Sequence, residues 1–242
     1  MSCFFLAMTL FPDVQLKAQE EIDRIVGTKR LPNVEDRANL PYIDAIVKEV
    51  LRWHPVAPIG VPHMTTEDDI FNGYLIPKGA LILANIWYAS IFFYSLLLSV
   101  PPNFHSIVAN FDTSNRAINH DPKVYHDPSV FKPERFLNSP EHEPEPDPHD
   151  VSFGFGRRIC PGRVLADSAI YLTVAQSLAV FTVSKAVENG KEIEPVVQFS
   201  PGIISHPAPY QTSIKPRSPE HEALVRPVEV EHPWEESDAK YL

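Results

Sequence analysis

The chain has 242 residues and a formal net charge of -10 at pH 7. This acidic balance excludes a nucleic-acid binder of the usual kind, because binding to a phosphate backbone depends on clustered Lys and Arg. The two cysteines, Cys3 and Cys160, lie far apart in no Cys-x-x-Cys or Cys/His pattern, so neither a disulfide framework nor a zinc site is predicted and a reduced, intracellular environment is expected.

Two amphipathic helices are predicted near the start of the chain. Residues 1–10 are apolar, but they lack the basic region and cleavage site of a secretory signal and are too short to span a bilayer. Pro12 then opens a run whose apolar positions recur at helical spacing until Gly27 ends it. A second such run begins near Pro41 and stops before Pro55.

The middle and end of the chain are expected to mix strands, loops and one long helix. Residues 56–86 alternate apolar runs with turn residues, which predicts short antiparallel strands joined by tight turns. Residues 138–150 alternate Pro with acidic residues, which indicates an exposed loop. Residues 164–183 have the length and composition of a buried helix. Residues 218–242 are predicted to be an acidic, flexible tail.

The run Phe-Gly-Phe-Gly-Arg-Arg-Ile-Cys-Pro-Gly at residues 153–162 carries the chemistry. Cys160 stands just before a predicted helix, whose free N–H groups and dipole stabilise a thiolate. Glycines in the run allow the backbone to turn sharply and approach a flat ring, and Arg158 suits an anionic group such as a haem propionate. A cysteine can instead be a small buried apolar residue, but this long, unusual spacing favours a thiolate ligand of haem iron.

This run resembles the haem-binding loop of the cytochrome P-450 superfamily. Upstream, Glu49-Val50-Leu51-Arg52 is similar to the family's Glu-x-x-Arg pair, and residues 131–136 are similar to its Pro-Glu-Arg-Phe segment. The three motifs follow one another in the family's order. The resemblance implies that Glu49, Arg52 and Arg135 form a buried network that fixes the core beneath the haem rather than taking part in catalysis.

The resemblance also implies a fold and a set of site residues. The expected fold is mainly α with small antiparallel β sheets, with residues 1–217 forming the C-terminal part of a single cytochrome P-450 domain. Cys160 would be the axial ligand of haem b. The family's pattern places further residues around the haem: Phe153, Gly154, Gly156, Arg158 and Gly162. His63 matches a propionate-binding position, although a surface histidine in a turn is an equal alternative.

Two segments, residues 56–61 and 201–205, would supply substrate-facing strands. The apolar residues expected to face the substrate are Val56, Ala57, Ile59, Val61, Ile203 and Ile204. The resemblance implies a monooxygenase that takes electrons from an NADPH-dependent reductase and inserts one atom of O2 into a lipophilic small molecule. Its thiolate would push electron density onto the iron and favour O–O cleavage. Basic residues near the cysteine, Lys132, Arg157, Arg158 and Arg163, suggest a docking patch for an acidic reductase.

The resemblance covers only the C-terminal half of a normal family member. The oxygen-activating acid-Thr segment does not precede Met1, and the membrane anchor that often holds family members at the endoplasmic reticulum is absent. The alternative function is therefore a catalytically incompetent fragment that retains the haem-ligand motif. A helical interaction protein with coincidental motifs is disfavoured by the order of the three motifs.

Residues 88–116 interrupt the resemblance. Family members run directly from Ala-Asn-Ile-Trp into the segment that matches residues 117–122. The codons for Trp87-Tyr88-Ala89 must contain GTAYGC, and those for Asn115-Arg116 can end in AG, so the insert is interpreted as a translated, unspliced intron. A genuine insertion, such as an apolar hairpin or surface helix, is the rival interpretation.

Overall fold

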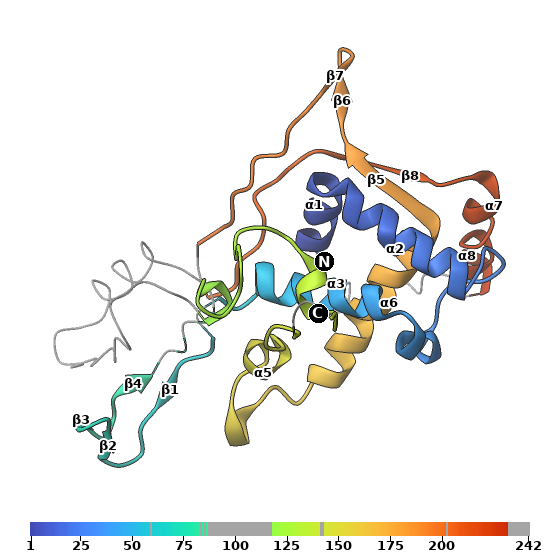
Figure 1. Cartoon of the computed structure of the whole chain (residues 1–242). Helices are drawn as coiled ribbons and strands as arrows, with labels where there is room; N and C mark the ends of the chain where they lie inside the picture. Colours follow the sequence, from blue (N-terminus) through green and yellow to red (C-terminus); the bar gives the residue numbers. More distant parts are fainter. Residues whose placement is uncertain are drawn as a thin grey trace, which may run out of the picture.

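The computed structural model describes residues 1–58, 60–82, 84, 86, 118–140, 143–201 and 203–231. The predicted insert at 88–116, Ile59 and the last part of the predicted tail lie outside these residues. In the described part, helices form the body of the molecule and every sheet is a two-stranded antiparallel pair. This agrees with the predicted fold class (Figure 1).

Four helices surround the core: α1 (Ser2–Leu10), α2 (Pro12–Ile25), α3 (Pro41–Trp53) and α6 (Arg163–Val180). Pro12 and Pro41 occupy the first turns of α2 and α3, where proline costs no hydrogen bond. Gly27, with φ 77°, follows the end of α2 in a conformation that favours glycine. Both predicted helices are therefore confirmed.

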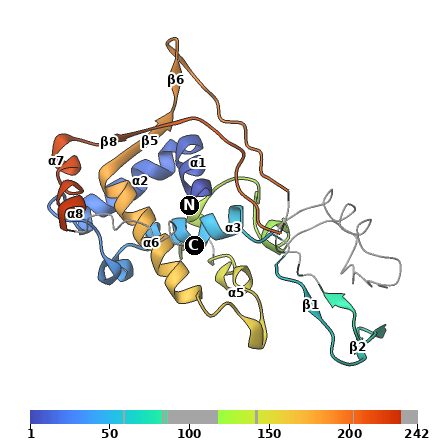
Figure 2. The ribbon, with the colours of Figure 1, turned by 180° about the vertical axis from the view of Figure 1, so that it is seen from behind.

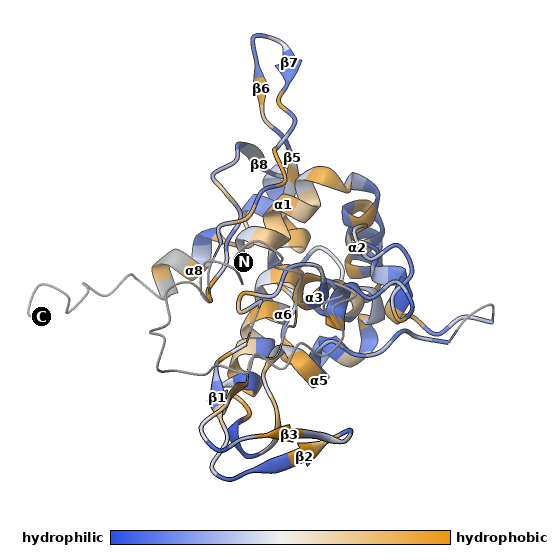
Figure 3. Ribbon diagram, turned by 90° about the vertical axis from the view of Figure 1, so that its left-hand side faces the viewer, coloured by the Kyte–Doolittle hydropathy of each residue, from blue (hydrophilic) through white to orange (hydrophobic). Residues whose placement is uncertain are grey.

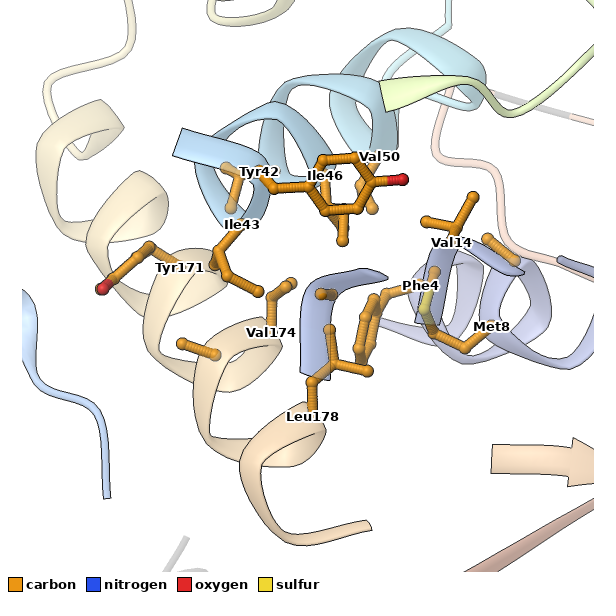
Figure 4. Packing of buried hydrophobic residues seen from close by; sticks show 14 of the residues in the cluster. Phe4, Met8, Val14, Tyr42, Ile43, Ile46, Val50, Tyr171, Val174 and Leu178 are labelled. Carbon is orange, nitrogen blue, oxygen red and sulfur yellow. The ribbon is translucent and has the colours of Figure 1, made fainter. Parts of the chain in front are cut away.

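The core is apolar and joins α1, α3 and α6. Phe4 from α1, Ile43 and Ile46 from α3, and Val174 and Leu178 from α6 are all 0–1% exposed. Figure 4 shows these side chains pointing toward one another between the helices. Apolar residues accordingly concentrate on α1 and α6 in the hydropathy view (Figure 3). This burial holds α3, which carries Glu49 and Arg52, in a fixed relation to α6, which follows Cys160.

The helix predicted over residues 164–183 is found as α6, but it ends earlier than predicted and its first turn is not buried. The helix ends at Val180, and β5 (Phe181–Lys185) then pairs with β8 (Thr212–Pro216). The Phe-Thr-Val sequence that opens β5 is rich in aromatic and β-branched residues, which pack well on a pleated surface. At the other end, Val164 and Leu165 are 69% and 77% exposed.

Short strands are found where the sequence predicted them between residues 56 and 86. β1 (His63–Met64) pairs with β4 (Leu81–Ile82), and β2 (Asp69–Phe71) pairs with β3 (Tyr74–Ile76). Asn72 and Gly73 form the β2–β3 turn with φ 49° and 81°, as a tight hairpin requires. Figure 2 shows β1 and β2 extending away from the helices. The remaining pair, β6 (Val187–Glu188) with β7 (Lys191–Glu192), extends from the end of β5 on another side of the molecule (Figure 1).

Short helical turns connect these elements. They are η1 (Val34–Asn39), η2 (Ile118–His120), η3 (Pro133–Phe136), α5 (His149–Ser152), η4 (Gly156–Arg158), α7 (Pro219–Glu222) and α8 (Arg226–Glu231). The described part of the predicted tail thus contains α7 and α8. No helix among the described residues has the length and apolar character needed to cross a membrane.

The predicted exposed loop at residues 138–150 is only partly exposed. It contains the start of α5, and Pro148 is buried. The Glu145 side chain is only 10% exposed, because it binds a buried arginine. A pattern of prolines and acidic residues is typical of solvated loops, but an acidic side chain can be buried where it pairs with a buried cation.

Candidate functional site

Glu49 and Arg52 lie one turn apart on α3, and both side chains are completely buried. Arg52 donates from Nε to Glu49 Oε2 at 2.7 Å and from Nη2 to Glu49 Oε1 at 2.9 Å. The guanidinium therefore meets the carboxylate with two parallel hydrogen bonds. Its Nη1 also donates to the Asn119 carbonyl at 2.9 Å, which ties η2 to α3.

Arg135, from η3, joins this pair as the third buried member. Its Nε lies 3.2 Å from Glu49 Oε2, and its Nη1 donates to the His126 carbonyl at 2.7 Å. The Lys132 N–H donates to Glu49 Oε1 at 2.7 Å. The structure thus brings Glu49, Arg52 and Arg135 together, and each of them also has a hydrogen bond with a backbone group.

Glu145 is a fourth member, which the sequence analysis missed. Arg135 Nη1 donates to Glu145 Oε2 at 2.6 Å, so this buried guanidinium faces two carboxylates. Burial alone would raise the pKa of Glu145, but the hydrogen bonds from Arg135 and His126, together with the charge of Arg135, outweigh burial and the pKa is lowered. No local signal marks Glu145, because it belongs to the acidic, proline-rich segment and meets its partner only through tertiary folding.

Cys160 lies on the surface in the turn between η4 and α6. Its N–H donates to the Phe153 carbonyl at 2.9 Å, which closes the glycine-containing segment into a compact loop. Gly154 and Gly156 have φ of 83° and 59°, a conformation that side chains with a Cβ seldom adopt. The glycines in the run are therefore required by the backbone path of this loop.

The long helix α6 begins three residues after Cys160, as predicted. Gly162 precedes the helix, and a Cβ added there would lie 3.8 Å from the Cys160 sulfur. Exposed apolar side chains flank the thiol in sequence: Phe155, Val164 and Leu165. An accessible sulfur before a helix N-terminus, among apolar side chains, fits the iron and the apolar face of a haem.

The remaining predicted site residues lie in less restrained positions. Arg158 is exposed in η4, and Phe153 is half-buried. His63 is exposed on β1, where it pairs with Ile82. Exposure leaves the side chains of Arg158 and His63 accessible to an anionic ligand group, but the protein contacts assign them no role.

The prediction that residues 56–61 and 201–205 form strands was wrong. None of the described residues in 56–61 or 201–205 belongs to a strand, although the Ser205 N–H donates to the Val56 carbonyl at 2.9 Å and joins the two segments. Proline and glycine punctuate both segments and interrupt ladder formation. The predicted substrate residues that are described are mostly exposed: Val56, Val61, Ile203 and Ile204, with Ala57 half-buried.

Comparisons with known proteins agree on a family. The family model "Cytochrome P-450" matches residues 1–90 and 111–214. The chain is 50% identical to cytochrome P-450 monooxygenase claR of Ampulloclitocybe clavipes, over 100% of the chain and 40% of that protein. It is 45% identical to O-methylsterigmatocystin oxidoreductase of Aspergillus flavus, over 99% of the chain and 39% of that protein.

A solved structure supports the same assignment. A zebra fish cytochrome P-450, determined with abiraterone, matches with a TM-score of 0.69 and 31% identity over 90% of this chain and 44% of that chain. The chain therefore spans less than half the length of these relatives and has part of their fold. From its three ordered motifs, its fold and the family match, the chain belongs to the cytochrome P-450 family.

Proposed function

We propose that this chain contributes the thiolate side of a haem-thiolate monooxygenase, with Cys160 as the axial ligand of the haem iron. The observation that carries the proposal is the accessible Cys160 thiol in a glycine-shaped loop immediately before α6. Bound haem would supply O2 activation, the chemistry that its curated relatives' names as monooxygenases indicate. The substrate would be lipophilic, and electrons would come from an NADPH-dependent reductase.

The protein's own residues would hold the ligand rather than react. The backbone bond from Cys160 to Phe153 fixes the loop, and because α6 begins three residues after Cys160, its N-terminal N–H groups and positive dipole end would stabilise a thiolate there. Exposed Arg158 and His63 are proposed to bind the haem propionates. The network of Glu49, Arg52 and Arg135 would hold α3 and η3 together and would take no part in the reaction.

Haem titration of the purified 242-residue chain tests the proposal. Addition of haem to the wild type, followed by reduction and carbon monoxide, is expected to give the difference spectrum of a thiolate-bound haem. Cys160→Ser should lose that spectrum, whereas Cys3→Ser, the matched control at the other cysteine, should keep it. Absence of haem uptake by the wild type would favour the alternative of a chain that retains the motif but cannot bind haem.

We also propose that residues 88–116 are an insert relative to the family. The family model leaves residues 91–110 unmatched, and these lie within the proposed insert. Sequencing of mature transcripts distinguishes an unspliced intron from a genuine insertion. A message spliced in frame across these codons would support the unspliced-intron interpretation, and retention in all mature messages would support a genuine insertion.

A further inference from the structure

Six charged side chains form a closed ring beside the segment that carries Cys160. Around the ring, acidic and basic groups alternate: Asp147, Lys48, Asp44, Arg37, Asp167 and His149. They come from α3, η1, α6, α5 and the residue before Pro148. Because every member has two oppositely charged neighbours, the ring connects three stretches that are distant in sequence: residues 37–48, residues 147–149 and Asp167.

The acidic and basic members make close contacts. Lys48 Nζ lies 3.0 Å from Asp147 Oδ2 and 3.4 Å from Asp44 Oδ2. Arg37 Nη2 lies 2.7 Å from Asp44 Oδ1, and Arg37 also binds Asp167 through both of its terminal nitrogens. The side chains of these residues are between 21% and 38% exposed. Solvent therefore screens the ring only in part.

His149 closes the ring and is its only member with an ordinary pKa near neutrality. Its Nδ1 lies 2.6 Å from Asp147 Oδ1, and its Nε2 lies 2.8 Å from Asp167 Oδ1. Ionised carboxylates only accept hydrogen bonds, so both ring nitrogens must donate and the ring must be an imidazolium. Burial lowers the pKa of His149, but the bonds to Asp147 and Asp167 outweigh burial and the pKa is raised above 6.5.

The position of His149 relates this charge to the cysteine loop. His149 opens α5 and Asp167 lies in α6, so their hydrogen bond closes the chain segment that contains Cys160. The His149 ring also stacks on Phe153, with ring centroids 6.0 Å apart. Phe153 in turn accepts the backbone hydrogen bond from Cys160. The His149 side chain thus contacts Asp167, beyond the end of the cysteine loop, and Phe153, at the start of that loop.

We propose that His149 is a positioning residue, which as an imidazolium ties α5 to α6 and so holds the Cys160 loop in place. Loss of its proton removes one donor and leaves a carboxylate facing a nitrogen lone pair, which opens the loop at its base. The consequence for a haem ligand rests on the proposed function, but the tether is a property of the protein chain alone.

Hydrogen exchange measured by mass spectrometry tests the tether without haem. The amides of residues 153–162 in the full 242-residue chain are followed from about pH 6 to about pH 9, and each rate is corrected for intrinsic exchange. In the wild type, protection of the loop should fall as the pH rises. His149→Phe should exchange about tenfold faster at the lower pH and show no such pH dependence. His149→Arg, which keeps the charge, should restore protection at both ends of the range.

The control is His206→Gln, which removes an exposed imidazole from another segment and should leave the loop unchanged. Amides of the β5–β8 pair report whether a variant retains its fold. Loop protection in the wild type that does not vary with pH, or equal protection in a folded His149→Phe variant, would overturn the proposal. Haem binding is not measured, so failure of the tether and failure of haem ligation give separate results.

Discussion

At the scale of single residues, the buried arginines show how much the interior depends on complete pairing. Arg52 and Arg135 are at most 1% exposed, and each binds Glu49 as well as backbone carbonyls. A buried cation without partners costs several kcal/mol, so the network is stable only as a set. Glu145 matters because it provides a second carboxylate for Arg135.

Replacement of Glu145 by Gln should therefore destabilise the protein by about 2 kcal/mol, because Arg135 loses a charge-assisted hydrogen bond in a buried site. Urea unfolding followed by circular dichroism measures this change. Glu143→Gln is the matched control, since Glu143 is exposed in the same segment. Equal stability of the two variants would show that Glu145 contributes nothing to the network.

At the scale of elements, β5 depends on α2 as well as on its partner strand. Gln15 accepts from the Val183 N–H at 2.7 Å and donates to the Val183 carbonyl at 2.9 Å, and Gln19 donates to the Phe181 carbonyl at 3.0 Å. These glutamines of α2 are buried and take the place of a neighbouring strand along one edge of β5. The edge is thereby covered and its polar groups are satisfied.

Gln15→Ala should cost about 3 kcal/mol, because it leaves a buried N–H and a buried carbonyl of Val183 without partners. The free energy of unfolding in urea is the measurement. Glu20→Ala, on the exposed face of the same helix, should change stability by less than about 0.5 kcal/mol. A similar small effect for Gln15→Ala would mean that water replaces the glutamine.

At the scale of the whole molecule, stability is expected to decrease in acid. Burial is the main cause that lowers the pKa of His54 and of His120 to about 3. In mild acid the unfolded chain therefore binds protons at these two histidines that the folded chain does not bind. For Asp147 and Asp167, burial raises the pKa, but the hydrogen bonds and the charges of their cationic partners together outweigh burial and lower it. Both effects remove stability as the pH falls, the histidines from about 6.5 and the carboxylates from about 4.

His149 changes stability with pH in the opposite direction. Its raised pKa contributes stability that is complete below about pH 6.5 and is lost as the pH rises through the raised pKa. Urea unfolding free energies measured against pH should therefore decline below about pH 6, with a smaller decline in the alkaline direction. His54→Phe should reduce the acid decline, since a phenyl ring can keep the stacking on Phe199 and Ser205 retains its bond to Ser200. A rise in stability between about pH 6 and pH 4 would contradict this assignment.

The sequence by itself determined the two amphipathic helices, the β2–β3 hairpin and the family motifs, because each depends on periodicity, turn residues or spacing within a short stretch. Only the tertiary structure decided the end of α6 and the partners of the charged residues. Phe181 leaves the helix because β8 and the glutamines of α2 provide hydrogen bonds to an extended chain. Glu145 and His149 look like surface residues in a proline-rich segment, and they acquire roles only where folding places Arg135 and Asp167 beside them.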